Sequence, residues 1–403
     1  MRQTGIQLKE NNLRISVREL VEQVLRHGDL HSSFSNRKRA LEGTLGHQTV
    51  QNQRGDNYRR EIQVSQKVTD NPLGITLEVH GRIDGVYKKD DDQFVVEEIK
   101  TTYKDLDSLN PEEDGLHFSQ ARVYAFLFSK QFDLETVQVD LTYFHIKETK
   151  TKTFSHQYTQ KDLKKYFDHL VDCYLESIRE LYEWRDIRDQ SIRQLEFPFL
   201  NYRNGQRSFM EEVYGAICGG INLFAQAPTG LGKTISVLFP TIKALAEGIC
   251  TRIFYLTART TTREAPEQAL EYMREKGLRL KSIVITAKEK TCLKDEMICS
   301  PDHCEYLFNY FGKIKAAIHE IYGYDSFNKS RIEECARKHK VCPFELSLDL
   351  SVICDCIICD YNYFFDPRIQ LARYKSESRQ PFVYLVDEAH NLVERSRTMY
   401  SAE

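Results

Sequence analysis

The run 227–234, Ala-Pro-Thr-Gly-Leu-Gly-Lys-Thr, has the residue types that are needed to hold the phosphates of a nucleotide. Glycines such as Gly230 and Gly232 let backbone N–H groups turn toward phosphate oxygens, and the positive end of a following helix adds to the attraction. In that arrangement Lys233 reaches the β- and γ-phosphates, while the Thr234 hydroxyl ligates Mg²⁺. The first position is alanine where the strict pattern has glycine, which is a change between two small residues. We therefore predict that this run binds ATP or GTP.

An acidic pair, Asp387 and Glu388, follows the apolar run 381–386 and opens the sequence Asp-Glu-Ala-His. In a nucleotide-hydrolysing protein the first carboxylate of such a pair holds Mg²⁺ through water, and the second polarises the attacking water. The same four residues could also form the cap of a surface helix. Their position after the phosphate-binding run, at the end of a strand-like segment, favours the catalytic interpretation.

A second set of charged residues lies in the first half of the chain, on two strand-like runs. Asp84 belongs to the run 75–87, and Glu98 and Lys100 belong to the run 94–102. Strand alternation places Glu98 and Lys100 on one face. If the two runs pair as a hairpin through the polar turn between them, Asp84 meets Glu98 near the strand ends. Two carboxylates that hold Mg²⁺ or Mn²⁺ beside a lysine suit the hydrolysis of a phosphodiester bond.

Three further residues could complete such a site. His47 lies on a predicted helix that precedes the two strands, and it is a candidate third metal ligand. Gln120 and Tyr124 lie one helical turn apart on a predicted helix that follows them. The acid-x-lysine pattern alone is weak, because the solvated face of a strand often produces it.

Four cysteines, Cys292, Cys299, Cys304 and Cys342, lie between the phosphate-binding run and the acidic pair. Four thiolates can ligate either zinc or an iron–sulfur cluster, and their spacing alone does not choose between the two. Zinc sites usually consist of two tight cysteine pairs. Cys342 is far from the third cysteine and has no nearby partner except Cys335, which weakens the case for zinc.

Length and composition set the remaining bounds. At 403 residues the chain should contain two or three domains, and 41% apolar residues suffice for their cores. The N-terminus lacks the apolar segment of a secretion signal, and no apolar run is long enough for a membrane span, so we expect a cytoplasmic protein without a membrane partner. Eleven cysteines in such a chain indicate metal ligands or buried thiols. A net charge of −3 means that nucleic-acid binding would depend on local basic surfaces.

The pattern of elements changes near residue 190. Residues 1–190 form a first predicted domain, with helices over 16–26, 37–51, 115–129 and 163–184 and strands over 75–87, 94–102 and 136–146. The polar stretch 184–190 is predicted to be the linker. Residues 191–403 show short apolar strands that alternate with helices, which is typical of a parallel α/β sheet. These strands are expected over 221–225, 252–257, 282–286, 352–359 and 381–386. The three cysteines within 352–359 indicate a buried strand rather than a second metal site.

The order of motifs over residues 195–403 resembles the XPD/DinG family of iron–sulfur helicases in superfamily 2. Within this resemblance Gln206 corresponds to the adenine-reading residue, and Arg259 and Thr260 correspond to a motif that touches DNA backbone. The resemblance implies ATP hydrolysis, 5′→3′ movement on single-stranded DNA, and a [4Fe–4S] cluster on the four cysteines in an insert at about 287–345. The chain ends shortly after the acidic pair, so we expect that a second motor domain is missing and that this part alone hydrolyses ATP poorly.

The set Gly-x₃-His, Asp, Glu-x-Lys and Gln-x₃-Tyr, in that order, resembles the RecB/Cas4 branch of the PD-(D/E)xK nucleases over about residues 15–150. It implies a metal-dependent DNase in which His47, Asp84 and Glu98 hold the metal. Cas4-type members also carry a cysteine cluster, whereas the first half of this chain has only Cys173.

The predicted fold class is therefore a PD-(D/E)xK α/β nuclease core followed by a P-loop, RecA-like motor domain with a parallel sheet. The predicted function is an ATP-dependent DNA helicase fused to a nuclease, acting in DNA repair, recombination or defence. Three alternatives remain open at this point. The chain could be a non-catalytic DNA-binding or assembly module, its four cysteines could hold structural zinc, or its substrate could be RNA.

Overall fold

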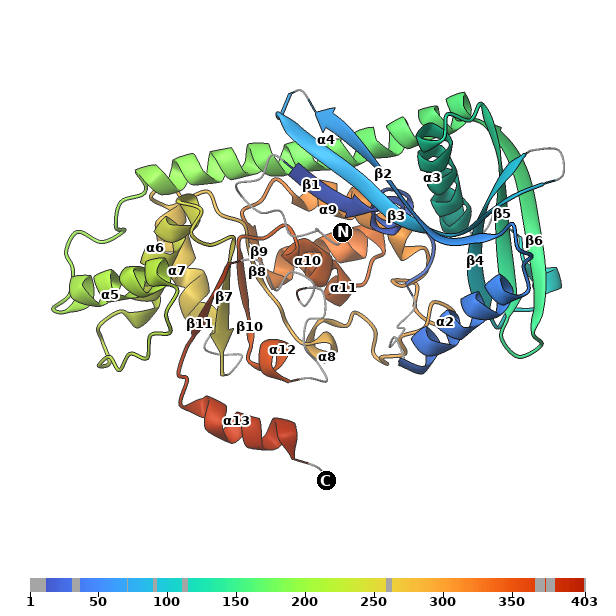
Figure 1. The fold of residues 1–403 in the computed structure, drawn as a ribbon. Helices are drawn as coiled ribbons and strands as arrows, with labels where there is room; N and C mark the ends of the chain where they lie inside the picture. The colour runs from blue at the N-terminus through green and yellow to red at the C-terminus, as the bar shows by residue number, and fades with distance from the viewer. Residues whose placement is uncertain are drawn as a thin grey trace. The chain divides into compact units, whose positions relative to one another are not determined.

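The computed structural model describes residues 12–30, 37–70, 72–89, 93–110, 115–258, 263–366, 374 and 381–401. The chain divides into two compact units, one built from residues 10–26 and 32–179, the other from residues 1–9, 27–31 and 180–403. Figure 1 shows the helices and strands of both units. None of the described helices is long and apolar enough to cross a membrane.

The first unit is built on a mixed six-stranded sheet of order β1-β3-β4-β5-β6, with β2 paired to β3. Its strands are β1 (Asn12–Ser16), β2 (Arg59–Asp70), β3 (Ile75–Lys88), β4 (Phe94–Thr102), β5 (Thr136–His145) and β6 (Lys150–Thr159). Strands β3 and β4 pair antiparallel from Lys88 opposite Phe94 to Gly85 opposite Glu97, which confirms the expected hairpin. Strands β1, β2 and β6 were not predicted. In β6, for example, polar residues occupy both faces, so the strand lacks the apolar alternation of a half-buried strand.

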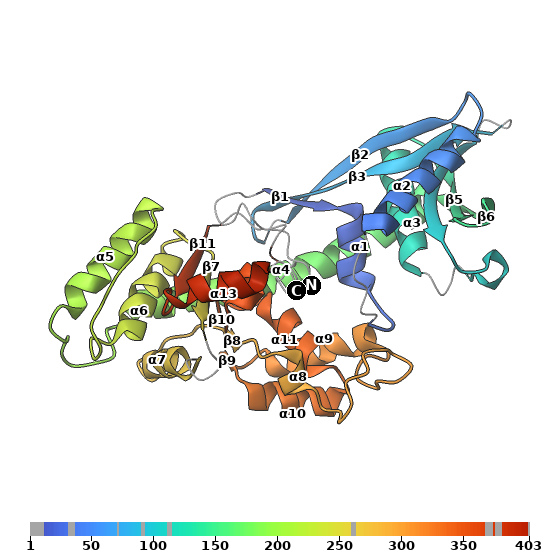
Figure 2. The same ribbon diagram turned by 90° about the horizontal axis from the view of Figure 1, so that it is seen from below.

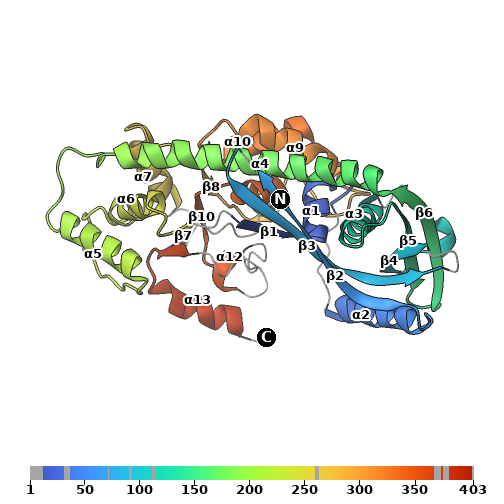
Figure 3. The ribbon, with the colours of Figure 1, turned by 45° about the horizontal axis from the view of Figure 1, so that its top comes forward.

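Helices α2 and α3 lie on opposite faces of this sheet (Figure 3). The helices of the unit are α1 (Val17–Leu25), α2 (Arg37–Asn52), α3 (Gly115–Gln131) and the first part of α4 (Gln160–Gln194), with a short 3-10 helix η1 (Leu106–Ser108). Gly46 of α2 approaches Thr101 and Phe144 so closely that a Cβ atom at this position would overlap Thr101. Gln120 of α3 instead contacts Lys100, whose side chain points to the other face.

The second unit is a three-layer α/β arrangement around a parallel sheet of order β11-β7-β10-β8-β9. The strands are β7 (Arg252–Thr257), β8 (Ser282–Val284), β9 (Ser326–Phe327), β10 (Cys356–Asp360) and β11 (Phe382–Val386). The helices are the rest of α4, α5 (Gln206–Gly219), α6 (Lys233–Ala246), α7 (Glu264–Arg274), α8 (Lys288–Thr291), α9 (Tyr310–Ile321), α10 (Lys329–His339), α11 (Pro343–Ser351), α12 (Asn362–Phe365) and α13 (Asn391–Tyr400). Figure 2 shows α6 and α7 on one side of the strands and α9, α10 and α11 on the other.

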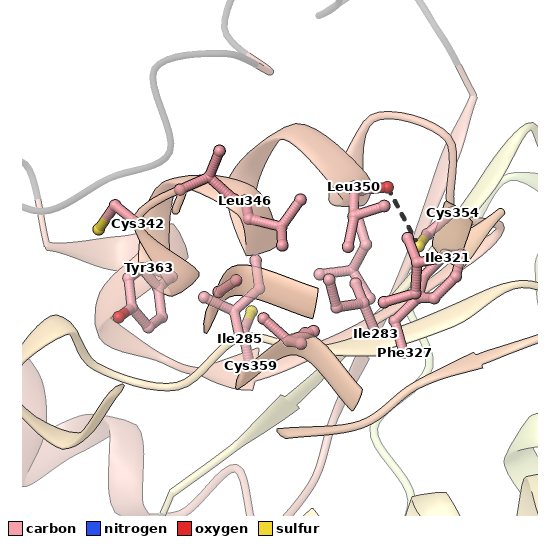
Figure 4. Packing of buried hydrophobic residues seen from close by; sticks show 14 of the residues in the cluster. Ile283, Ile285, Ile321, Phe327, Cys342, Leu346, Leu350, Cys354, Cys359 and Tyr363 are labelled. Atoms are coloured by element: carbon pink, nitrogen blue, oxygen red, sulfur yellow. Dashed lines mark hydrogen bonds between the residues drawn. The ribbon is translucent and has the colours of Figure 1, made fainter. Parts of the chain in front are cut away.

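Alternating residues of the strands form the cores of the two faces. Ile253 and Tyr255 of β7 pack with residues of α6 and α7, whereas Phe254 and Leu256 pack with residues of α9, α10 and α11. The two cysteines within β10, Cys356 and Cys359, follow this alternation, and Cys354 precedes the strand. Cys356 belongs to the first core and Cys354 and Cys359 to the second, where the Cys354 thiol donates to the Leu350 carbonyl oxygen at 3.2 Å (Figure 4). Burial raises the pKa of all three thiols. Of the predicted buried strand 352–359, residues 356–359 lie in β10, whereas residues 352–355 precede it and form no strand.

The predicted strand 221–225 is wrong. This segment forms no strand, and Ile221 and Phe224 are 67% and 91% exposed. Within the part of the chain that the structure describes, β11 pairs only with β7, so the segment has no ladder partner. An apolar run becomes a strand only when a neighbouring strand satisfies its backbone groups, and its composition cannot specify that neighbour.

The predicted boundary segment 184–190 is not a linker, because helix α4 runs through it without a break, and the two units divide between residues 179 and 180. Its polar residues are partly buried rather than solvated. The Trp184 indole N–H donates to the Asp355 carboxylate at 3.1 Å, and the Arg188 guanidinium donates to the same carboxylate at 2.6 Å. A polar stretch that is paired inside a domain has the same composition as a solvated linker, so the two are indistinguishable in the sequence.

Candidate nuclease and nucleotide sites

Asp84 lies where strands β3 and β4 separate. The ladder between them ends at Gly85 and Glu97, and the next backbone donor on β4, the Ile99 N–H, binds the Asp84 carboxylate at 2.8 Å. The carboxylate therefore lies between the two strands and next to Glu98. This local break in the ladder brings the two acidic side chains into one site.

Glu98, Lys100 and Gln120 form a continuous chain of contacts on one face of the sheet. The Lys100 ammonium donates to the Glu98 carboxylate at 2.6 Å and to the Gln120 side-chain oxygen at 2.8 Å. Burial raises the pKa of Glu98 to about 7, and the charge of Asp84 adds to this increase, while Lys100 and His47 oppose it. A carboxyl group with this pKa is partly protonated at neutral pH when no cation is bound.

Helix α2 supplies His47 and Gln51. The His47 ring nitrogen Nδ1 lies 3.3 Å from an Asp84 carboxylate oxygen, and the Gln51 amide donates to the Asp84 backbone carbonyl at 2.9 Å. Burial lowers the pKa of His47, but the hydrogen bond and the charge of Asp84 outweigh it, so the pKa is raised overall. Two residues of one helix thus hold Asp84 from its side chain and from its backbone.

Tyr124 completes the group from helix α3, where its ring packs over Gly81 of β3. Its pKa is raised by burial first and then by the charges of Glu98 and Asp84, so the hydroxyl stays neutral. The structure therefore brings together all six residues that the sequence selects for a nuclease site: His47, Asp84, Glu98, Lys100, Gln120 and Tyr124.

A polar network on the opposite face of β4 was missed by the sequence analysis. The carboxylate of Glu97 is fully buried and pairs with the Arg54 guanidinium. It also accepts hydrogen bonds from the Tyr58 hydroxyl at 2.7 Å and the Thr142 hydroxyl at 2.6 Å. The available signal was the other charged residue of the run 94–99, Glu97, which alternation places on the face opposite Glu98, because a buried carboxylate requires a partner. The partner comes from a residue just after α2, far away in the sequence.

The described residues contain no group of three His, Cys, Asp or Glu side chains in metal-binding geometry. The donor types at the nuclease site nevertheless suit a divalent cation, because two carboxylates and an imidazole converge there. In the structure both carboxylates already contact other groups of the protein. Asp84 contacts the His47 ring and the Ile99 N–H, and Glu98 contacts the Lys100 ammonium. A bound cation would have to exchange for some of these contacts.

In the second unit, the phosphate-binding run leads directly into helix α6, which begins at Lys233. Gly230 and Gly232 have φ angles of 87° and 81°, a conformation that residues with a Cβ atom rarely adopt. Gln206 is buried and lies so close to Gly232 that a Cβ atom there would meet its amide group. The Arg203 guanidinium donates to the Gly230 carbonyl oxygen, so the residues around Gln206 hold the loop directly.

The acidic pair faces the same loop. The Lys233 ammonium lies 3.7 Å from the Glu388 carboxylate. Burial and the neighbouring Glu388 raise the pKa of Asp387, while Lys233 opposes the increase. The buried Tyr361 hydroxyl donates to the Asp387 carbonyl oxygen and holds the start of the pair in place. Arg259 and Thr260 lie outside the described residues.

The four cysteines of the insert, Cys292, Cys299, Cys304 and Cys342, line one small pocket together with Lys288 and Phe344. Burial lowers the pKa of Lys288, but contact with Cys299 and the nearby Glu345 outweigh it and raise the pKa overall. Burial also raises the pKa of Cys342 to about 11. Cys335 lies elsewhere in the core, where its thiol donates to the Ala317 carbonyl oxygen at 3.4 Å. A shared pocket of four thiols fits a metal group in its donor types, although the thiols are not in ligating geometry.

Comparison with known proteins matches the two halves of the chain to two families. Residues 5–207 match the PD-(D/E)XK nuclease superfamily, and residues 259–403 match the family DEAD_2. Among curated proteins, the chain is 22% identical to the human regulator of telomere elongation helicase 1 over 49% of this chain and 20% of that protein. It is 23% identical to the Caenorhabditis elegans homolog over 52% of this chain and 25% of that protein.

The chain therefore spans about a fifth to a quarter of the length of these relatives. Among solved structures, an XPD helicase aligns with 49% of this chain and 34% of its own length, at 19% identity and a TM-score of 0.35. A truncated XPD aligns with 45% of this chain and 52% of its own length, at 19% identity and a TM-score of 0.32. By the family match over residues 5–207, the chain belongs to the PD-(D/E)XK nuclease superfamily, and its residues 259–403 are similar to the DEAD_2 family.

Proposed function

We propose that this chain is part of a cytoplasmic, ATP-dependent DNA helicase whose first domain is an active, metal-dependent nuclease for single-stranded DNA. The observation that carries the nuclease proposal is the convergence of His47, Asp84, Glu98, Lys100 and Gln120 in one hydrogen-bonded group. These residues come from two strands and two helices, so local sequence does not bring them together by chance. A role in DNA repair, recombination or defence is consistent with such a combination.

The chemistry follows from the residue types. Asp84, Glu98 and His47 would hold Mg²⁺ or Mn²⁺, and the bound cation would polarise the phosphate and activate water. Lys100 has the position to stabilise negative charge that develops on the phosphate, because Gln120 holds its ammonium group on the face that carries Glu98. Tyr124 is buried and packs over Gly81 of β3, the strand that carries Asp84.

The direct test is the cleavage of a single-stranded oligonucleotide with Mn²⁺, compared between the wild type and Asp84→Asn. We expect a loss of at least about 100-fold in rate, because even residues that only support a metal ligand typically contribute 10- to 100-fold. The matched control is Asp107→Asn, which makes the same chemical change at a side chain that is 96% exposed. Equal cleavage by the wild type and Asp84→Asn would show that the activity comes from elsewhere.

A second candidate is a non-catalytic DNA-binding module with an inert nuclease fold. It is favoured by the protein contacts that occupy Asp84 and Glu98 in this arrangement. A wild-type protein that binds single-stranded DNA but does not cut it with either Mn²⁺ or Mg²⁺ would support this candidate over the nuclease.

In the second unit we propose binding of ATP together with Mg²⁺. Lys233 would contact the phosphates, and Thr234 and Asp387 would hold the cation. Glu388 would polarise the attacking water. Gln206 would read the adenine, as its position next to Gly232 suggests. A comparison of nucleotide affinity between the wild type and Lys233→Ala measures this part of the proposal. Movement in the 5′→3′ direction is proposed for the whole protein, of which this chain covers a part.

For the cysteine pocket we propose a [4Fe–4S] cluster held by Cys292, Cys299, Cys304 and Cys342, with structural zinc as the alternative. We expect anaerobically purified protein to be coloured and to contain about four iron atoms per chain. Cys304→Ser should remove the colour and the iron, whereas Cys335→Ser should not. A colourless protein that contains one zinc per chain would overturn the cluster.

A further inference from the structure

An exposed aromatic ring lies just beyond the strand that carries Glu98 and Lys100. The Tyr103 side chain is 44% exposed, although its backbone directly follows β4. The Arg39 guanidinium carbon lies 4.6 Å from the centre of its ring, and the Lys147 ammonium lies 5.8 Å from it. We call these three residues, Tyr103, Arg39 and Lys147, the Tyr103 platform. It combines a flat apolar surface with two positive charges.

The platform is held in place by contacts on several sides. The Tyr103 hydroxyl donates to the Glu42 carboxylate at 2.6 Å, and the Arg39 guanidinium donates to the Thr101 carbonyl oxygen at 3.0 Å. His145 of β5 contacts the Tyr103 carbonyl oxygen at 3.3 Å. The ring is therefore oriented by its neighbours while a large part of it stays in contact with solvent.

The distance to the nuclease residues matches one or two nucleotides. Tyr103 follows Lys100 by three residues, which corresponds to roughly 10 Å along an extended backbone. Arg39 and Glu42, which contact the Tyr103 side chain, belong to α2, the helix that also brings His47 to Asp84. A strand of DNA whose phosphate lies at Asp84 and His47 would thus bring a neighbouring nucleotide to the platform. Both features lie within the same unit of the structure.

From this placement we propose that the Tyr103 platform binds an unpaired nucleotide of single-stranded DNA next to the cleavage position. The proposal rests on the nuclease function proposed above. A base stacks on an exposed tyrosine or on the plane of an arginine, and the two cations attract the flanking phosphates. Paired bases in a duplex do not offer their faces in this way, so the platform would favour single strands.

Fluorescence of a tryptophan at position 103 reports binding at the platform itself. The chain has a single tryptophan, Trp184, which is buried, so Tyr103→Trp adds one exposed indole. In EDTA, where no cleavage occurs, we expect oligo-dT to quench the added emission strongly and a blunt duplex of the same length to leave it nearly unchanged. The wild type is the control, because its emission reports only Trp184. Unchanged emission at oligo-dT concentrations that saturate binding by anisotropy would overturn the proposal, as would equal quenching by the duplex.

Two further variants test the platform without a new reporter. We expect Tyr103→Leu to weaken the affinity of the full chain for oligo-dT about tenfold and Tyr103→Phe to retain it, because stacking needs the ring and not the hydroxyl. Arg39→Gln should reduce the slope of log affinity against log salt by about 0.7, the value for one phosphate contact on a single strand. Lys164→Gln, an exposed charge change on α4, should leave that slope unaltered.

The outcomes separate this proposal from the nuclease assignment. If Asp84→Asn abolishes cleavage but Tyr103→Trp shows no quenching, the nuclease stands and the platform is wrong. If quenching occurs but the wild type does not cleave, the platform binds single-stranded DNA in a domain that is not a nuclease. An affinity of Tyr103→Leu equal to that of the wild type would also count against the platform.

Discussion

Replacement of Glu98 by glutamine is expected to abolish DNA cleavage and, at the same time, to stabilise the metal-free protein at pH 8. The folded-state pKa of Glu98 is raised from 4.5 to about 7, mainly by burial. Between these two values the folded state binds more protons than the unfolded state, so stability falls as pH rises from about 4.5 to 7. Above pH 7 the buried negative charge costs up to about 3 kcal/mol of unfolding free energy.

Glutamine has nearly the same shape and carries no charge, so the variant avoids this cost. The figure of about 3 kcal/mol is an upper bound, because glutamine also loses the charged contact with Lys100. Urea unfolding in EDTA at pH 5 and pH 8 measures the effect: the variant should exceed the wild type at pH 8 and be close to it at pH 5. Glu148→Gln, at a side chain that is 54% exposed, is the control. A difference between wild type and Glu98→Gln that is independent of pH would refute the electrostatic explanation.

Arg54→Met is expected to destabilise the nuclease domain strongly, by about 3–5 kcal/mol. The carboxylate of Glu97 is fully buried on the face opposite the nuclease residues, and among the described residues Arg54 is the cation that pairs with it. Removal of the guanidinium leaves a negative charge in the core with only the hydroxyls of Tyr58 and Thr142 as donors. The change in unfolding free energy can be measured by urea denaturation at pH 8.

The double variant Arg54→Met/Glu97→Gln separates the charge from the packing. Because it removes both partners of the ion pair, it should recover most of the lost stability. A double variant that is as unstable as Arg54→Met alone would show that the arginine acts through packing. An effect of Arg54→Met below about 1 kcal/mol would mean that the pair behaves like an exposed ion pair.

The DNA cleavage rates of the same variants would show whether the Arg54–Glu97 pair on one face of β4 affects the nuclease residues on the other face. Arg54 follows directly after α2, the helix that carries His47 and Gln51. The pair with Glu97 therefore fixes the end of this helix to the strand that carries Glu98. At a temperature where the double variant is folded, we expect a lower cleavage rate than for the wild type, because His47 is then less well positioned against Asp84.

Much of the candidate sites could be predicted from residue order alone. The glycines before Lys233 need a tight turn into a helix, and strand alternation puts Glu98 and Lys100 on one face; both are local rules of backbone geometry. The hairpin of β3 and β4 is also local, because few residues separate the two strands in the sequence. These features depend on residues within a few positions of one another.

The remaining features depend on contacts between distant residues. The Arg54–Glu97 pair, the shared pocket of Cys292 to Cys342, and the missing ladder partner for 221–225 all involve segments whose proximity no local pattern encodes. The same holds for α4, where Trp184 and Arg188 are buried because they donate to Asp355, a residue far away in the sequence. Motifs and alternation thus follow from the sequence, whereas burial, pairing and the protonation of Glu98 depend on the packed structure, because they arise from long-range contacts.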